Sequence, residues 1–112
     1  MADCLFCQIA QKKIPSQSTF EDEELYAFHD IHPQAPTHIL IIPKRHVAGV
    51  VELQAEDEKM AGRLILQAKK IAESLKLKSF RLVFNSGPEA GQSVFHLHLH
   101  LLGGRPMSWP PG

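Results

Sequence analysis

Three histidines, His96, His98 and His100, alternate with leucines toward the C-terminal end of the chain, and they are the strongest candidates for chemistry. Strict alternation is the period of a strand, on which successive side chains point to opposite faces. We therefore expect the three imidazoles to share one face, about 6.5–7 Å apart along the strand. The other face would carry apolar side chains that sit on a core, namely Phe95, Leu97, Leu99 and Leu101.

Two kinds of chemistry fit such a row of imidazoles. Neutral imidazole is the commonest metal ligand, and histidine can also act as a nucleophile that forms a covalent intermediate. The plain structural alternative is a half-buried strand whose polar face happens to be histidine. Because histidine is not a favoured strand residue, the pattern supports the functional interpretations over this alternative.

A turn-rich loop, residues 86–93, leads directly into the histidine segment. Its glycines, Gly87 and Gly91, permit a positive φ and a close backbone approach, and backbone N–H groups in such a loop can bind an anion. Gln92 and Ser93 add side-chain donors. An anion-binding loop beside an imidazole row favours phosphoryl or nucleotidyl transfer.

The segment Gln92–Leu102 resembles the histidine triad signature, in which three histidines alternate with apolar residues. The run Gly103–Gly112 and the segment Phe28–His38 resemble the Hint branch of that superfamily, the histidine triad nucleotide-binding proteins. The resemblance covers nearly the whole chain. It implies the HIT fold, a homodimer whose sheets join into one, and a purine nucleoside phosphoramidase that hydrolyses adenosine 5′-monophosphoramidate and AMP–amine conjugates.

The resemblance also implies roles for single residues. His98, the middle histidine, is the expected nucleophile, and its nucleotidyl intermediate would be released by water. His96 completes the triad, and His100 would contact the phosphate. His38 would support the histidine network, while Ser93 would contact the leaving group. The expected nucleotide site comprises Leu5, Phe6, Ile9, Phe28, His29, Asp30, Ile31, Asn85, Gly91, Gln92, Ser93, His98, His100 and Trp109.

This chemistry places requirements on the site. A histidine that attacks phosphorus must be neutral, and its other ring nitrogen must be held by an acceptor. An amine expelled from a P–N bond needs a proton in the transition state. Asp30 is suited to accept both ribose hydroxyls, while apolar walls would contact the purine without strong discrimination. We therefore expect purine nucleotides in general, including AMP, GMP and their phosphoramidates, as partners.

Cys4 and Cys7 form a Cys-x-x-Cys pair that could contribute to a tetrahedral zinc site. The plain alternative is two small, half-buried cysteines on a helix. Many bacterial histidine triad proteins carry such a pair, although the Hint branch often lacks it. The resemblance implies a structural zinc, with no cofactor required for catalysis, held by Cys4, Cys7, His46 and His96.

Size, charge and apolar runs limit the number of domains, the class of partner and the cellular location that we expect. The 112 residues suffice for one domain, residues 1–112, with a real core. Twelve basic and twelve acidic residues cancel, so nothing favours a nucleic-acid or membrane partner. No secretory signal pattern and no apolar run of about 20 residues is seen. We therefore expect a cytoplasmic protein, in which the two cysteines do not form a structural disulfide.

Residue patterns around the histidines predict a small α+β domain. Residues 3–11 suit a short amphipathic helix, and an apolar stripe predicts a long helix over about residues 56–77. That stripe comprises Met60, Leu64, Ala68, Ile71 and Leu75, widened by Ala61, Ile65 and Ala72. Further strands are expected at residues 19–21, 25–29, 38–43 and 80–85. Short connections favour antiparallel pairing, so we predict an antiparallel sheet of about five strands with one long and one short helix.

Two other functions stay open at this point. One is a dinucleoside polyphosphate hydrolase of the same superfamily, against which the C-terminal segment Gly103–Gly112 argues. The other is a nucleotide-binding interaction protein with incidental turnover, and the apolar tail around Trp109 is consistent with an interface. A metal-dependent binding module would lose its function with a chelator and not with loss of His98, whereas an enzyme would show the reverse.

Overall fold

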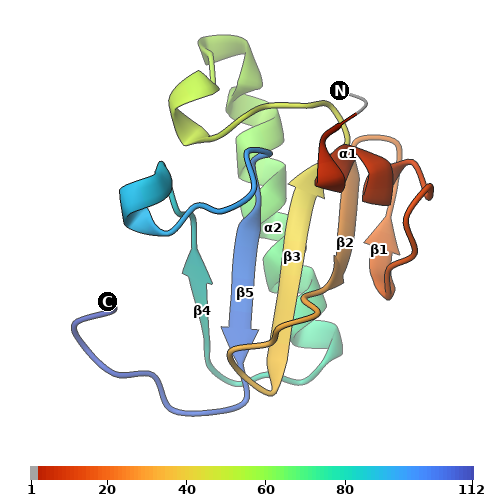
Figure 1. Ribbon diagram of the computed structural model, residues 1–112. Helices are drawn as coiled ribbons and strands as arrows, with labels where there is room; N and C mark the ends of the chain where they lie inside the picture. The colour runs from red at the N-terminus through yellow and green to blue at the C-terminus, as the bar shows by residue number, and fades with distance from the viewer. Residues whose placement is uncertain (1–2) are drawn as a thin grey trace.

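A five-stranded antiparallel sheet of order β1-β2-β3-β5-β4 organises the computed structural model, which describes residues 3–112 (Figure 1). The strands are β1 (Ser18–Glu21), β2 (Leu25–His29), β3 (Thr37–Pro43), β4 (Phe80–Val83) and β5 (Leu99–Gly103). The α-helices are α1 (Leu5–Ala10) and α2 (Glu58–Ser74), and the 3-10 turns are η1 (Val50–Glu52), η2 (Ala55–Asp57) and η3 (Pro88–Ala90). The predicted α+β class, with one long and one short helix, is confirmed.

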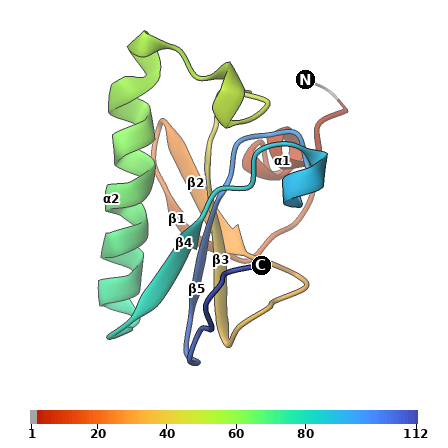
Figure 2. The same ribbon diagram turned by 90° about the vertical axis from the view of Figure 1, so that its left-hand side faces the viewer.

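The two helices cover opposite faces of the sheet, with α2 on one side and α1 on the other (Figure 2). Because side chains alternate along each strand, β2 and β3 each contribute to two cores. On β3, Ile39 and Ile41 pack into the core beneath α2, whereas Leu40 and Ile42 pack into the core beneath α1. The α1 face is therefore the one that also carries His38 and His100.

The long helix begins after η2, slightly later than predicted. A capping box precedes it, in which the Asp57 carboxylate accepts a hydrogen bond from the Gln54 N–H at 2.9 Å. Most of the predicted stripe is buried, but Ile65 is 48% exposed and Leu75 is 45% exposed, so the prediction was wrong at these two positions. Leu75 already lies beyond the last helical turn, and Ile65 lies beside the stripe on the solvent side of the helix.

The predicted strand over the three histidines is only partly correct. β5 begins at Leu99, so His96 and His98 lie in irregular chain just before it. The ladder between β3 and β5 ends there because Pro43, near the end of β3, has no N–H to donate. The Leu97 N–H instead donates to the Val47 carbonyl at 2.6 Å.

The face opposite the histidines also departs from the prediction at one end. Leu97, Leu99 and Leu101 are buried in the core beneath α2, as predicted. Phe95 is 49% exposed and does not sit on the core, because the chain bends at residues 94–96 before it runs into β5.

None of the helices described for residues 3–112 combines the length and apolarity that a membrane crossing requires. Cys4 and Cys7 are both free thiols. The cytoplasmic location and the lack of a nucleic-acid partner stay predictions.

Replacing Leu64 by Ala should lower the free energy of unfolding by about 2–5 kcal/mol, because the fully buried side chain leaves a cavity under α2. The neighbouring Ile65→Ala variant is the control and should change it by no more than about 0.5 kcal/mol, since Ile65 faces solvent. Urea unfolding followed by circular dichroism measures both. Equal losses would contradict the assignment of the buried face.

Candidate active site

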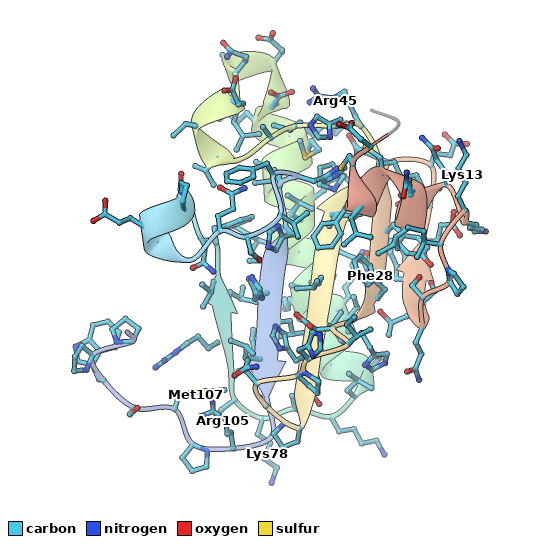
Figure 3. All side chains as sticks on the ribbon, viewed as in Figure 1. Lys13, Phe28, Arg45, Lys78, Arg105 and Met107 are labelled. Carbon is cyan, nitrogen blue, oxygen red and sulfur yellow. The ribbon has the colours of Figure 1, made fainter. Side chains whose placement is uncertain are left out.

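A cavity of about 390 Å³ opens on the α1 face of the sheet. Its walls come from α1, the end of β2, the loop that follows β2, and the histidine segment. Phe28, labelled in Figure 3, lies on this face and packs edge-to-face against Phe6 of α1, with ring centroids 5.4 Å apart. Most of the predicted nucleotide-site residues line this one cavity, namely Leu5, Phe6, Ile9, Phe28, His29, Asp30, Ile31, Ser93, His98 and His100.

Four predicted residues do not line the cavity: Asn85, Gly91, Gln92 and Trp109. The Gln92 side chain instead holds the loop of residues 86–93 together. Its Oε1 accepts from the Gly87 N–H at 2.9 Å, and its Nε2 donates to the Ala48 carbonyl at 2.8 Å. Gly87 and Gly91 adopt the positive φ that glycine permits, 91° and 99°. Trp109 is 83% exposed in the C-terminal tail.

Sequence reasoning missed several residues of the cavity wall, namely Ile14, Pro15, Ser16, His32, Leu40 and Val94. For Leu40 a signal was available, since it lies two positions after His38 on β3 and must share its face. The segment after α1 carried no such signal, because its place in the wall depends on how α1 packs on the sheet.

His98 has the protonation pattern that a nucleophile needs. Its Nδ1 lies 2.7 Å from the backbone carbonyl oxygen of His96. Because a carbonyl oxygen only accepts, Nδ1 must carry the proton and donate it, which leaves the lone pair on Nε2. Burial lowers the pKa of His98, so the ring is neutral near neutral pH. The Phe6 ring packs edge-to-face on it at 5.1 Å and fixes its orientation.

Two linked hydrogen bonds, from Gln34 to His38 and from His38 to His100, fix the tautomer of His100. The backbone N–H of Gln34 donates to Nδ1 of His38 at 3.0 Å, so neutral His38 carries its proton on Nε2. That nitrogen lies 2.9 Å from Nδ1 of His100, which must therefore accept and carry its own proton on Nε2. The pKa of His38 is lowered by burial. Burial, with His98 and His38 nearby, lowers the pKa of His100 to about 4.

These hydrogen bonds leave the Nε2–H of His100 as a donor without an acceptor. Within residues 3–112 this nitrogen is a buried side-chain polar atom with no hydrogen-bond partner. An unpartnered buried donor is costly, and a ligand oxygen that accepts from it removes that cost. Since His98 and His100 both line the cavity, with ring centroids 4.9 Å apart, a nucleophilic lone pair and a donor lie side by side.

Asp30 lies at the same cavity, directly after β2. Its Oδ1 accepts from the His32 N–H at 2.8 Å, and its Oδ2 lies 3.4 Å from Nε2 of His38. These contacts hold the carboxylate within the loop that follows β2. Together with the hydrogen bonds from Gln34 to His38 and from His38 to His100, these contacts occupy both ring nitrogens of His38 and the Nδ1 of His100.

The predicted metal ligands also come together. The Sγ atoms of Cys4 and Cys7 and the Nδ1 atoms of His46 and His96 all lie within 4.8 Å of one another. Nδ1 of His96 lies 3.4 Å from Cys4 Sγ and 3.5 Å from Cys7 Sγ, and Nδ1 of His46 lies 3.3 Å from Cys7 Sγ. In a tetrahedral zinc site, adjacent sulfur and nitrogen ligands are about 3.5 Å apart. The four residues therefore fit a zinc ion.

The tautomer of His96 agrees with this fit. Its Nε2 lies 2.7 Å from the Pro43 carbonyl oxygen and must donate to it, so the lone pair is on Nδ1 and faces the two thiols. Burial is the main reason that the pKa of His96 falls to about 4, and burial also raises the pKa of the Cys7 thiol. Two sulfurs and two imidazole nitrogens are the ligand set of a closed structural zinc site.

The chain belongs to the HIT domain family, which it matches over residues 11–107. It is 49% identical to an uncharacterized HIT-like protein of Synechocystis over 98% of this chain and 97% of that protein. A 14 kDa zinc-binding protein of Zea mays is 48% identical over 96% of this chain and 87% of its own length. The crystal structure of a HIT family hydrolase from Legionella pneumophila superposes with a TM-score of 0.95 at 51% identity, covering 98% of this chain and 100% of that one.

The neutral state of half-buried His100 should make the fold sensitive to acid. The pKa of this imidazole is 6.5 in an unperturbed histidine and about 4 in the folded protein. Between these two pH values the unfolded chain therefore binds more protons than the folded chain. The free energy of unfolding should therefore fall as the pH drops from about 6.5 to about 4. Urea unfolding at about pH 7 and about pH 5 measures this, and the His100→Gln variant should show a smaller pH dependence.

Asp22 should contribute little over that range. Although burial opposes it, hydrogen bonds from Arg63 and the backbone lower the pKa of Asp22 from 3.8 to about 2, so its unfolded and folded values both lie below the range. A pH dependence that is the same in the wild type and in His100→Gln would contradict the neutral state assigned to His100.

Proposed function

We propose that this HIT-family chain is a purine nucleoside phosphoramidase, which hydrolyses adenosine 5′-monophosphoramidate and related AMP–amine conjugates. The observation that carries the proposal is the pairing of His98 and His100 in one cavity. The first presents a neutral Nε2 with a free lone pair, and the second presents an unpartnered Nε2–H. A nucleophile beside a donor for a phosphate oxygen is the arrangement that nucleotidyl transfer to histidine requires.

In the first step, the His98 Nε2 lone pair attacks phosphorus and forms a P–N bond to the ring. The bond from phosphorus to the amine breaks, and its electron pair leaves with the amine nitrogen, which takes up a proton. Ser93, which lines the cavity, would deliver that proton from its hydroxyl. The His100 N–H donates to a phosphate oxygen as negative charge develops there.

In the second step, water attacks phosphorus and passes a proton to Ser93, which restores the hydroxyl. The bond to His98 Nε2 breaks and its electron pair returns to the ring, which releases AMP and restores neutral His98. Asp30 would accept from the ribose hydroxyls, and the largely apolar wall formed by α1 and β2 would hold the purine. These contacts read the base by its shape and apolar surface, so GMP conjugates should also be substrates.

Two further parts of the proposal concern assembly. We infer that a zinc ion, when bound by Cys4, Cys7, His46 and His96, would tie α1 to the segment before β5 and would leave His98 free. Similarity to the HIT family hydrolase of Legionella pneumophila supports the hydrolase assignment. Similarity to the zinc-binding protein of Zea mays supports the zinc assignment. We also propose a homodimer, in which the exposed tail around Trp109 contributes to the interface.

The His98→Asn variant should release no AMP from adenosine 5′-monophosphoramidate, because the amide nitrogen of asparagine is not nucleophilic and cannot attack phosphorus. It should keep the fold and the affinity for AMP, since the cavity wall is otherwise intact. Steady-state AMP release and calorimetric AMP binding measure the two properties. Turnover at the wild-type rate in this variant would rule out the nucleophile.

The same assay separates the rival enzyme class. Diadenosine polyphosphate offered with the wild-type protein should be cleaved far more slowly than the phosphoramidate. Fast cleavage of the polyphosphate with slow phosphoramidate turnover would assign the chain to the dinucleoside polyphosphate hydrolases. AMP binding without either activity would support a nucleotide-binding interaction protein.

Purified protein should carry about one zinc ion per chain, and the Cys4→Ser/Cys7→Ser double variant should carry none. Chelation of the wild type should lower its melting temperature, because the ion would link α1 to the sheet. Elemental analysis and thermal unfolding measure both, and His98→Asn serves as the control that keeps its zinc. A metal-free wild type whose melting temperature does not respond to chelator would remove the zinc assignment.

A further inference from the structure

The C-terminal tail meets the active-site loop at one end of the sheet. β3 and β5 are antiparallel with Thr37 opposite Gly103, so the residues just before β3 and just after β5 lie next to each other. Gly104 has φ of 92°, and a Cβ built there would lie 2.9 Å from Cβ of Pro36. The tail therefore packs directly on the loop of residues 30–36, with no room for a side chain at this glycine.

Arg105 makes the polar contact between these two segments, and Figure 3 shows it at this end of the sheet. Its Nε and Nη2 both donate to the backbone carbonyl of Gln34, at 3.1 and 3.0 Å. Its Nη1 donates to the Pro106 carbonyl at 3.0 Å. The guanidinium is thus fixed by three hydrogen bonds, two of which converge on one oxygen of the loop.

Gln34 connects this contact to the histidines. Its backbone N–H is the donor to Nδ1 of His38, and its side-chain Nε2 donates to the His32 carbonyl at 3.0 Å. Each peptide unit is planar, so only the φ and ψ of Gln34 separate its N–H from its carbonyl, and holding the carbonyl narrows the directions that the N–H can take. Arg105 therefore acts on the backbone donor that, together with the Asp30 carboxylate 3.4 Å from Nε2, decides where His38 carries its proton.

We propose that Arg105 is a positioning residue of the active site, which acts through Gln34 to fix the tautomers of His38 and His100. With the Gln34 N–H in place, the His100 Nε2–H points to the substrate phosphate. Without it, His38 can carry its proton on Nδ1, and His100 then turns its own proton toward His38. Its Nε2 lone pair would face a phosphate oxygen and repel it. The effect on turnover rests on the proposed function, whereas the effect on the tautomers does not.

The chain offers a matched control for this proposal. Arg81 of β4 is a second arginine that holds the tail, through a donation from Nη2 to the Ser108 carbonyl at 2.9 Å. Within residues 3–112, Arg81 makes no hydrogen bond or ion pair with the loop of residues 30–36, so its loss should loosen the tail and leave the donor to His38 in place. Comparison of Arg105→Ala with Arg81→Ala therefore separates a role in positioning from general support of the tail.

The direct readout is the ¹⁵N NMR spectrum of the histidine side chains, which distinguishes the two neutral tautomers without any substrate. In the wild type and in Arg81→Ala, His38 and His100 should both show the Nε2–H tautomer. In Arg105→Ala both should show a mixture of tautomers. With phosphoramidate as substrate, kcat of Arg105→Ala should fall about tenfold, the size expected for misplaced catalytic groups, while AMP affinity changes little.

A double-mutant cycle tests whether Arg105 acts through His38. In a His38→Ala background, Arg105→Ala should cause no further loss of kcat, because the residue it positions is gone. Wild-type tautomers in Arg105→Ala would overturn the proposal whatever the turnover, and so would an equal effect in Arg81→Ala. If the wild-type protein does not hydrolyse the phosphoramidate, the proposed function fails, and the NMR comparison still decides the positioning role.

Discussion

A neutral imidazole has one proton for two nitrogens, and the site depends on this constraint. Each buried histidine gives or receives a hydrogen bond at one nitrogen, so the partner on that side decides what the other nitrogen offers. The His96 carbonyl accepts from Nδ1 of His98, which leaves the lone pair of His98 on Nε2. The Gln34 N–H donates to His38, which in turn donates to Nδ1 of His100, so His100 carries its own proton on Nε2. Burial keeps all three rings neutral by lowering their pKa values. Backbone geometry, rather than charge, thus divides the roles among chemically identical side chains.

The same logic joins the site to the rest of the fold. Helix α1 places Phe6 against His98 in the cavity wall and carries Cys4 and Cys7 toward His96. The end of β3 supplies the Pro43 carbonyl that fixes the tautomer of His96. Proline at that position also stops the ladder, which frees the segment before β5 to bend. One residue therefore sets both the shape of the histidine segment and the direction of one of its lone pairs.

Much of this could be predicted from the sequence, because period and residue type carry the information. Alternation gave the buried leucines of the histidine segment, and the helical stripe gave α2. Ten of the residues that the family resemblance grouped into one site line the same cavity. The rest depends on tertiary contacts that no local pattern contains. From the alternation alone Phe95 is expected in the core, but β5 starts only after it and the side chain is half exposed. Gln92 is expected to donate to a ligand, but its side-chain amide forms hydrogen bonds that hold the loop. The link from Arg105 to Gln34 spans 71 positions and has no signature of its own.

The division of β3 between two cores also limits how the chain can change during evolution. Alternate residues of this strand serve opposite layers, with Ile39 and Ile41 on one side and His38 and Leu40 on the other. Inserting or deleting a single residue within β3 would exchange the two sets and bury the imidazole against α2. Length variation among related chains should therefore gather in the connections, such as residues 44–57, and be absent from the strands that carry the histidines. Substitution is open to this protein over much of its surface, whereas insertion and deletion are confined to its loops.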